Sequence, residues 1–202
     1  AIDREATEAL DGAVTRLRQA GAEIVAAEFP PPWHDAHLVL RTIMLHEAAT
    51  GLETVQARER RRMSPTLNAA LDEGRATPRA DYEAALRRRD DAIDAFTRWL
   101  AGFDAVLSPP AVGAAPADLT STGDPACCSL WSLTGFPAIS IPIGRAANGL
   151  PLGVQIVAGP SDGSDFFGTV ASHIANGLAS VVEAERLRRQ AAFATAMRLA
   201  SD

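Results

Sequence analysis

The sequence predicts an α/β fold in which helices flank a mixed β-sheet, and three observations support that class. Near the N-terminus, a helix-period pattern is followed at once by a β-rich run, the alternation expected of a layered sheet protein. A long helical stretch then covers about residues 33–102. Two further β-rich runs surround the pair Asn148-Gly149, which is typical of antiparallel strands.

The first helix is predicted to begin after Asp3, whose carboxylate can accept a hydrogen bond from a free N–H group of the first turn. Gly21 marks its end, because glycine adopts the left-handed conformation that ends many helices. The apolar stripe of this helix consists of Leu10, Val14 and Leu17. Residues 23–29 (EIVAAEF) read as a strand, which the prolines at 30–32 end because proline has no N–H to donate.

The segment 33–102 is predicted to contain several helices. Asp35 is the expected cap of the first of them. Ser64-Pro65 and Thr77-Pro78 are further helix starts, since proline is well tolerated in the first turn, and Gly102 closes the last helix. Apolar residues of that last helix recur close to the helical period at Tyr82, Leu86, Ile93, Phe96 and Leu100.

A short apolar run at 104–108 reads as a strand that is buried on both faces. Residues 111–122 are small, polar and proline-containing, so they form a loop. Asp124 is the expected cap of a short helix that includes Pro125 in its first turn and ends at Gly135. This helix is apolar almost all round, which indicates burial, at Cys127, Leu130, Trp131 and Leu133.

The strand predicted at 138–143 contains Pro142, which favours a sheet edge or a bulge. The chain returns as a second strand over 152–158, and a loop follows at 159–163. Asp165 then caps a predicted helix with apolar residues Phe167, Val170, Ile174 and Leu178. An amphipathic, arginine-rich helix is expected over 183–199. With no internal repeat and no clear boundary, residues 1–202 are expected to form one partial domain.

Composition limits the classes of partner. The net charge of −6 argues against nucleic acid. The arginine clusters at 58–62 and 87–89 lie among acidic residues and read as solvated helix faces. No apolar run reaches the roughly 18 residues of a membrane span, so no membrane partner is expected. No signal-peptide pattern is present either.

The use of cysteine and lysine indicates the cellular compartment of the protein and the type of genome that encodes it. Adjacent Cys127 and Cys128 do not suit disulfide geometry, which favours a reducing compartment and predicts a cytoplasmic protein. All 19 basic residues are arginine, and alanine is abundant, a bias typical of a GC-rich bacterial genome. The chain starts at Ala1 and its first methionine is Met44, which suggests that the natural N-terminus lies upstream.

Two patterns suggest metal or thiol chemistry, each with a simpler interpretation. His34 and His37 are three residues apart and would share a helix face, but only the distant His46 and Glu47 are available to complete a metal site. We therefore interpret them as surface or helix-start residues and expect no metal and no cofactor. The adjacent thiols lie in an apolar helix, where inert packing is the simpler interpretation.

A third pattern, Gly159 to Gly163, matches the nucleophile-elbow pattern G-x-S-x-G and would make Ser161 a nucleophile. The histidine that follows is His173, on a predicted amphipathic helix, where a structural role is the simpler interpretation. Pro160 stiffens the turn, so we interpret this segment as a loop without a catalytic triad.

Several phrases in order along the chain resemble amidase-signature hydrolases, which cleave carbon–nitrogen bonds. They are Leu17 through Val25, Glu47 within 44–49, Tyr82 through Arg89, Phe103-Asp104 through Pro109 (FDAVLSP), Thr122-Gly123-Asp124, Trp131, Gly135 through Pro142 (GFPAISIP) and Gly149 through Gln155 (GLPLGVQ). Each phrase alone is weak, and the ordered set is strong. The resemblance covers essentially the whole chain, but only about the C-terminal half of a typical family member. It implies a partial amidase-signature fold.

The resemblance implies a mechanism whose reacting groups lie elsewhere. In the family, a serine nucleophile is activated by a second serine in a cis peptide bond, which passes its proton to a neutral lysine. A glycine- and serine-rich loop supplies the N–H groups that stabilise the oxyanion. This chain has no lysine and no such loop. We therefore expect no catalytic residue in it and no activity from the chain alone.

The resemblance also suggests substrate-pocket residues and partners. Thr122, Gly123, Asp124 and Trp131 are the candidates for lining the pocket, although Asp124 can serve as a helix cap only and Trp131 as core only. The expected partners are a small amide substrate in the parent enzyme and the missing N-terminal half, or a second copy of the chain. The alternative function is a stand-alone, non-catalytic homologue that serves as a binding or partner subunit. Family substrates range from aliphatic, aryl, peptide and fatty-acyl amides to glutamine, and the sequence does not select among them.

Overall fold

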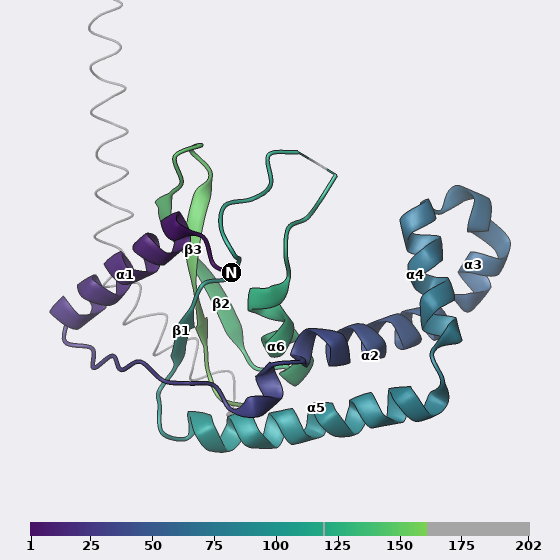
Figure 1. The fold of residues 1–202 in the computed structure, drawn as a ribbon, viewed down its shortest axis with the longest axis horizontal. Helices are drawn as coiled ribbons and strands as arrows, with labels where there is room; N and C mark the ends of the chain where they lie inside the picture. Colours follow the sequence, from purple (N-terminus) through teal and green to yellow (C-terminus); the bar gives the residue numbers. More distant parts are fainter. Residues whose placement is uncertain (119, 161–202) are drawn as a thin grey trace, which may run out of the picture.

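The computed structural model describes residues 1–118 and 120–160, which form a small sheet with helices on both faces and a long helical arm (Figure 1). In chain order the helices and strands are α1 (Arg4–Gln19), α2 (Ala36–Gly51), α3 (Glu53–Glu59), α4 (Pro65–Ala76), α5 (Arg79–Leu100), β1 (Val106–Ser108), α6 (Ala126–Thr134), β2 (Ala138–Arg145) and β3 (Pro151–Val157). Short 3-10 turns occupy Pro31–Trp33 and Arg60–Arg62. The predicted α/β class, with helices around a sheet, is confirmed.

Residues 161–202 fall outside the described part of the chain. They include Ser161 and the rest of the loop predicted at 159–163, the helix predicted after Asp165 and the helix predicted over 183–199. Within those residues, no helix is both long and apolar enough to cross a membrane.

The first helix has the predicted start and end. Asp3 caps α1 by accepting a hydrogen bond from the Ala6 N–H at 2.7 Å. Gly21 adopts φ +96°, which a residue with a side chain would adopt only with strain. The helix buries Ala13 and Leu17 against the sheet, so it covers one face of β2 and β3.

The strand predicted at 23–29 is wrong. This segment pairs with no strand in the described part of the chain, and Val25 is 57% exposed. Its contacts are sparse: the Ile24 carbonyl accepts a hydrogen bond from the Arg18 guanidinium, and Phe29 packs into the core. A strand needs a neighbour that supplies its hydrogen bonds, and β propensity alone does not provide one.

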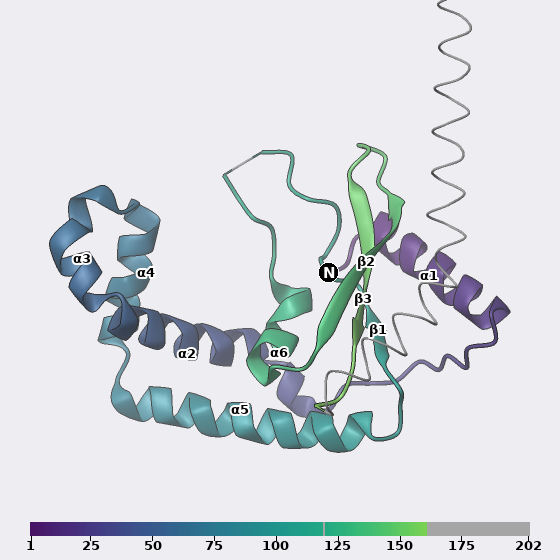
Figure 2. The same ribbon diagram turned by 180° about the vertical axis from the view of Figure 1, so that it is seen from behind.

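The helical segment predicted at 33–102 is confirmed as four helices that form the arm. α2 and α5 run side by side away from the sheet, and α3 and α4 lie at its tip (Figure 2). Ser64 caps α4 as predicted, accepting from the Leu67 N–H at 3.1 Å. Asp35 does occupy the position before α2, but it makes no capping hydrogen bond. Its carboxylate instead binds Arg88 of α5, because the long guanidinium side chain reaches it across the gap between the helices.

The described sheet has the order β1-β3-β2, and both pairs are antiparallel. The pairing of β2 with β3 around Gly149 confirms the predicted return of the chain. The register shifts between Pro142 and Gly144, which is the bulge that Pro142 suggested. β1 was expected to be buried on both faces, but it is an edge strand in which only Val106 is buried.

The face of the sheet opposite α1 packs on an aromatic cluster. Phe29, Phe96 and Trp131 contact one another edge to face, with ring centroids 5.7–5.8 Å apart. These rings come from the connecting segment, from α5 and from α6, so the cluster joins the arm to the sheet through Val106 and Val157. Edge-to-face contact is a favourable arrangement for aromatic rings because the positive edge of one meets the negative face of another.

A polar network fixes the tip of the arm. Gln56 of α3 is 2% exposed, and its amide donates to Asp72 of α4 at 3.3 Å and accepts from Arg75 at 2.7 Å. Arg60 binds the Asp72 carboxylate through two hydrogen bonds of 2.9 and 2.5 Å. This pairing, with smaller help from Gln56 and Arg75, lowers the pKa of Asp72 to about 2.

The crossing of α2 and α4 predicts a sharp penalty for a side chain at Gly74. A Cβ built there would overlap the backbone carbonyl of Leu45, which belongs to a helix and cannot move aside. We expect Gly74→Ala to reduce the free energy of unfolding by about 1–3 kcal/mol, measured by urea denaturation. Gly51→Ala is the control: no atom lies within 4 Å of the added Cβ, so a change of less than about 1 kcal/mol is expected. Equal effects of the two changes would contradict the close packing.

The Asp72 network predicts an acid-sensitive contribution to stability. A carboxyl whose folded pKa is depressed stabilises the fold above its unfolded pKa of about 3.9, and the contribution is lost as the pH falls to about 2. Wild type should therefore melt at a higher temperature than Asp72→Asn at pH 6, and the difference should shrink between pH 4 and pH 2. Asp94→Asn, which removes an exposed carboxylate on α5, serves as the control. A constant difference across this range would refute the assignment.

Candidate functional site

The candidate residues Thr122, Gly123 and Asp124 lie in an exposed turn that leads into α6. The Ser121 hydroxyl accepts a hydrogen bond from the Gly123 N–H at 3.1 Å. Gly123 has φ +90°, so the turn depends on a residue without a side chain. Upstream in the same loop, Asp118 accepts hydrogen bonds from both the N–H and the hydroxyl of Thr120. Local hydrogen bonds therefore shape the loop on both sides of Ser121.

Asp124 is bound to the start of α6, which begins one residue later than predicted. α6 begins at Ala126, whose N–H donates to the Asp124 carboxylate at 2.9 Å. Pro125 occupies the cap position, and its carbonyl accepts from Ser129. The capping contact was predictable because Asp followed by Pro before an apolar run is a common helix start. One carboxylate oxygen is thus engaged, and the side chain remains exposed.

Trp131 lies inside the aromatic cluster and is 4% exposed. It faces Phe29 and Phe96 and stacks on Phe136 at a centroid distance of 6.5 Å. Its indole therefore sets the rotation and depth of α6, and with them the position of the turn at its N-terminal end.

A second polar group near this turn was not among the predicted site residues. Gln155 of β3 is 4% exposed, and its amide nitrogen donates to the Ser108 hydroxyl and to the Cys127 carbonyl, each at 3.3 Å. It thereby links β3, β1 and the first turn of α6. Its place in an otherwise apolar strand is the sequence signal, since a buried amide requires partners.

The thiol beside this link is not activated. Burial, followed by the charges of Cys128 and Asp124, raises the pKa of Cys127, so the thiol stays protonated at neutral pH. The Cys128 thiol donates to the Pro125 carbonyl at 3.3 Å. Both cysteines are free, in keeping with the expected packing role.

The histidines of the arm lie in different environments. His46 stacks on Tyr82 at 4.2 Å, and the Tyr82 hydroxyl donates to Glu47 at 3.0 Å, a pairing that raises the pKa of Tyr82. His34 lies against Trp33 and lines a cavity of about 390 Å³ with Asp35, Arg88 and Asp91. Across the described residues, no group of three potential metal ligands converges.

Neither this cavity nor a second one beside α1 is lined by the four candidate residues. Among residues 1–118 and 120–160, no serine hydroxyl donates a hydrogen bond to a histidine or a carboxylate that could serve as its base. The whole sequence contains no lysine. In the described part of the chain, therefore, no serine is hydrogen-bonded to a base that would activate it.

A protein-family model described as Amidase matches residues 1–165. Among curated proteins, a glutamyl-tRNA(Gln) amidotransferase subunit of Lachnospira eligens is 35% identical over 85 residues, which cover 39% of this chain and 18% of that protein. The same subunit from Brevibacillus brevis is 35% identical over 92 residues, which cover 42% of this chain and 19% of that protein.

Solved structures agree in fold. An amidase crystal structure aligns with a TM-score of 0.70 and 26% identity, over 82% of this chain and 40% of that one. A 6-aminohexanoate cyclic dimer hydrolase, complexed with substrate, aligns with a TM-score of 0.71 and 23% identity, over 88% and 42%. A protein from a vestigial complex, linked to the origins of an s-triazine catabolic enzyme, reaches 0.74 at 21% identity, over 89% and 40%. The chain spans about two fifths of the length of these solved proteins.

The Gln155 link predicts a stability effect at the root of α6. We expect Gln155→Leu to reduce the free energy of unfolding by about 1–3 kcal/mol, because Ser108 and the Cys127 carbonyl lose their donor while remaining partly buried. Gln19→Leu, at the exposed end of α1, is the matched control and should change it by less than about 0.5 kcal/mol. Chemical denaturation measures both, and an equally small effect of the two changes would show that the link is dispensable.

Proposed function

This chain belongs to the amidase family, whose model matches residues 1–165, and we propose that it is the C-terminal portion of an amidase-type C–N hydrolase. The family match is the observation that carries this proposal. The fold shared with an amidase structure over 82% of the chain supports it. The similarity to the two glutamyl-tRNA(Gln) amidotransferase subunits supports it as well, since each is 35% identical to about two fifths of this chain.

In the proposed parent enzyme, hydrolysis follows the Ser–Ser–Lys mechanism that the resemblance implies. A serine attacks the amide carbonyl while a second serine passes its proton to a neutral lysine. Backbone N–H groups stabilise the resulting oxyanion. These groups come from polypeptide outside the 202 residues, because the chain contains no lysine. We accordingly propose that the isolated chain is inactive.

We assign this chain a share of the substrate-pocket wall, formed by Thr122, Gly123 and Asp124 and supported from below by Trp131. The exposed hydroxyl and carboxylate of the turn are the groups that would meet a polar amide substrate. The hydrogen bonds from Gly123 and Ala126 hold the turn in one shape, which limits the entropy lost on binding. Trp131 contributes as a positioning residue, since its buried ring fixes α6 below the turn.

We further propose that the rest of the parent enzyme covers the outer edge of β2. No described strand pairs with that edge, and Ala138, Ser140 and Pro142 are exposed along it. An open edge presents unpaired N–H and C=O groups that attract another strand. About three fifths of each solved relative lies outside its alignment with this chain, and we propose that the corresponding part of the parent enzyme supplies that strand.

The test compares the isolated chain with the longest polypeptide that its gene encodes in frame. Both are assayed on aliphatic and aryl amides and on glutamine, and their masses are measured by light scattering. We expect turnover from the longer polypeptide only. Turnover by the rigorously purified isolated chain would contradict the proposal that its reacting groups lie outside these 202 residues. A start codon directly before Ala1, with partner binding and no turnover, would instead favour the non-catalytic subunit.

Substitutions at Asp124 separate its two roles in the active polypeptide. Asp124→Asn keeps an oxygen that accepts from the Ala126 N–H but removes the charge, so the melting temperature should hold while KM for a polar amide rises by about tenfold. Asp124→Ala should also lower stability by about 1 kcal/mol through the lost capping contact. An unchanged KM in both variants would leave Asp124 as a cap and contradict its place in the pocket.

A further inference from the structure

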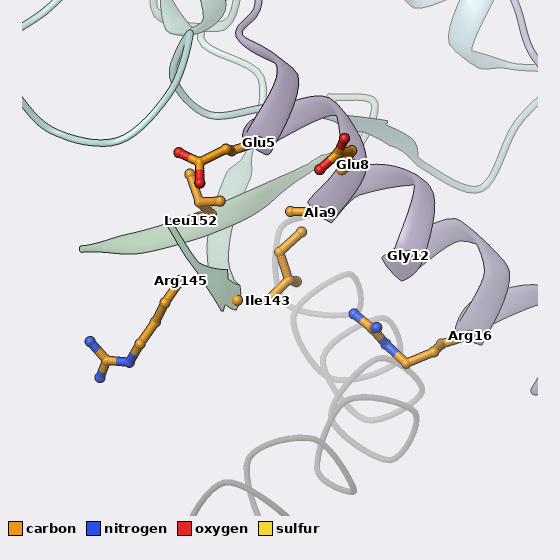
Figure 3. A pocket seen from close by; sticks show the side chains of 9 residues that line it. Glu5, Glu8, Ala9, Gly12, Arg16, Ile143, Arg145 and Leu152 are labelled. Carbon is orange, nitrogen blue, oxygen red and sulfur yellow. The ribbon is translucent and has the colours of Figure 1, made fainter. Parts of the chain in front are cut away.

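A cavity of about 310 Å³ lies between α1 and the edge strand β2, and the turn at Asp124 contributes none of its lining residues (Figure 3). Its lining includes Glu5, Glu8, Gly12, Arg16, Ile143 and Leu152. Figure 3 shows the two glutamates toward the N-terminal end of α1 and Arg16 toward the other end. The cavity is open to solvent on one side and has an apolar floor from the sheet, so a charged group inside it is partly shielded from water.

The Arg16 guanidinium has buried N–H groups without a partner. Its Nε and Nη2 atoms are buried and make no hydrogen bond with any described residue. A buried cation without a counter-charge is costly, and proteins rarely retain one. Guanidinium has a planar fork of donors that matches a carboxylate through two parallel hydrogen bonds, and Nε with one Nη is a common face of that fork.

The other charged groups of the cavity are already engaged or lie apart. Glu5 accepts a hydrogen bond from the Ala147 N–H at 2.8 Å, and Glu8 lies 3.6 Å from Arg4. Arg145 donates to the Gly149 carbonyl at 2.7 Å, and its side chain points away from α1 (Figure 3). Among the described residues that line this cavity, Arg16 is therefore the one whose buried N–H donors lack a hydrogen-bond acceptor.

We propose that this cavity is a carboxylate-binding site centred on Arg16. One source of the carboxylate is the chain itself: residues 161–202 continue from Pro160 and carry Asp162, Asp165, Glu183, Glu185 and Asp202. Ala158, only four residues before Asp162, packs in the same cluster as Leu17, the neighbour of Arg16. An extended chain covers about 3.3 Å per residue, so the first acids are within reach of α1. The other source is a small free carboxylate.

The sign of a stability change tests the site. Arg16→Met keeps a long side chain but removes the charge. If a carboxylate of the chain itself binds Arg16, the variant should lower the melting temperature of the full chain by roughly 5 °C, because the carboxylate loses its partner. If the chain supplies none, removing the unpaired cation should leave the melting temperature unchanged or raise it, and the site is then left to a free carboxylate. An unchanged or raised melting temperature in R16M, together with no response of the wild-type chain to added carboxylate, would overturn the proposal. Arg18→Met is the matched control on the same helix, since Arg18 is exposed and, among the described residues, its guanidinium donates to the Ile24 carbonyl alone.

Two further arms identify the source. In the first, each acid of 161–202 is neutralised singly, in the wild-type chain and in the R16M chain. An acid whose substitution lowers the melting temperature only when Arg16 is present marks an internal carboxylate. In the second, acetate and glutarate are titrated against chloride at constant ionic strength, and a rise in melting temperature that requires Arg16 marks a free carboxylate.

Destabilisation by R16M with no response in either arm would mean that Arg16 acts through packing alone, and the proposal would fall. Should R16M not fold, Arg16→Lys keeps the charge but not the fork, and it should retain only part of either response. The wild-type titrations and acid substitutions then decide. Because no residue of the turn at Thr122 to Asp124 lines this cavity, failure here would leave the proposed hydrolase function untouched.

Discussion

The contact of Phe29, Phe96 and Trp131 is the interaction on which the rest of the arrangement depends. Phe96 is completely buried, and each ring comes from a different part of the chain. Without this contact, α5 would lose its main aromatic packing against the sheet, and α6 would lose the ring contacts that fix its position. The position of the exposed turn at Thr122 to Asp124 thus follows from the packing of rings that lie well below it.

Features with a local cause were predictable from the sequence. Asp3 and Ser64 accept the N–H groups of their own helices, and Gly21 and Gly135 adopt positive φ where their helices end. The strand predicted at 23–29 failed because strand formation requires a distant partner, which a run of β-prone residues does not specify. Asp35 illustrates the same limit, since a guanidinium from another helix took the place of the capping contact.

The candidate site was predictable in part for the same reason. The loop conformation of Thr122 to Asp124 and the contact of Asp124 with α6 could be predicted, because both depend on residues that are adjacent in the sequence. The surroundings of Gln155 and Arg16 arise from elements that are brought together only by folding: Gln155 joins β3 to β1 and α6, and Arg16 of α1 lines a cavity with residues of β2. These neighbours are far apart in the sequence, so no short segment of it reveals them. In the sequence, such a residue can be recognised only as a single polar residue within an apolar stripe, without any indication of its partner.

The ion pairs at the tip of the arm give the two ends of the molecule different sensitivities to ionic strength. Arg41 with Glu73 and Arg60 with Asp72 join helices across the tip, and all four side chains are about half exposed. Dissolved salt screens such pairs, with a Debye length of about 8 Å at physiological strength and about 3 Å at 1 M. The aromatic cluster contains no charge to screen. Concentrated salt should therefore loosen the tip while the base of the arm stays packed, so that the arm opens from its free end.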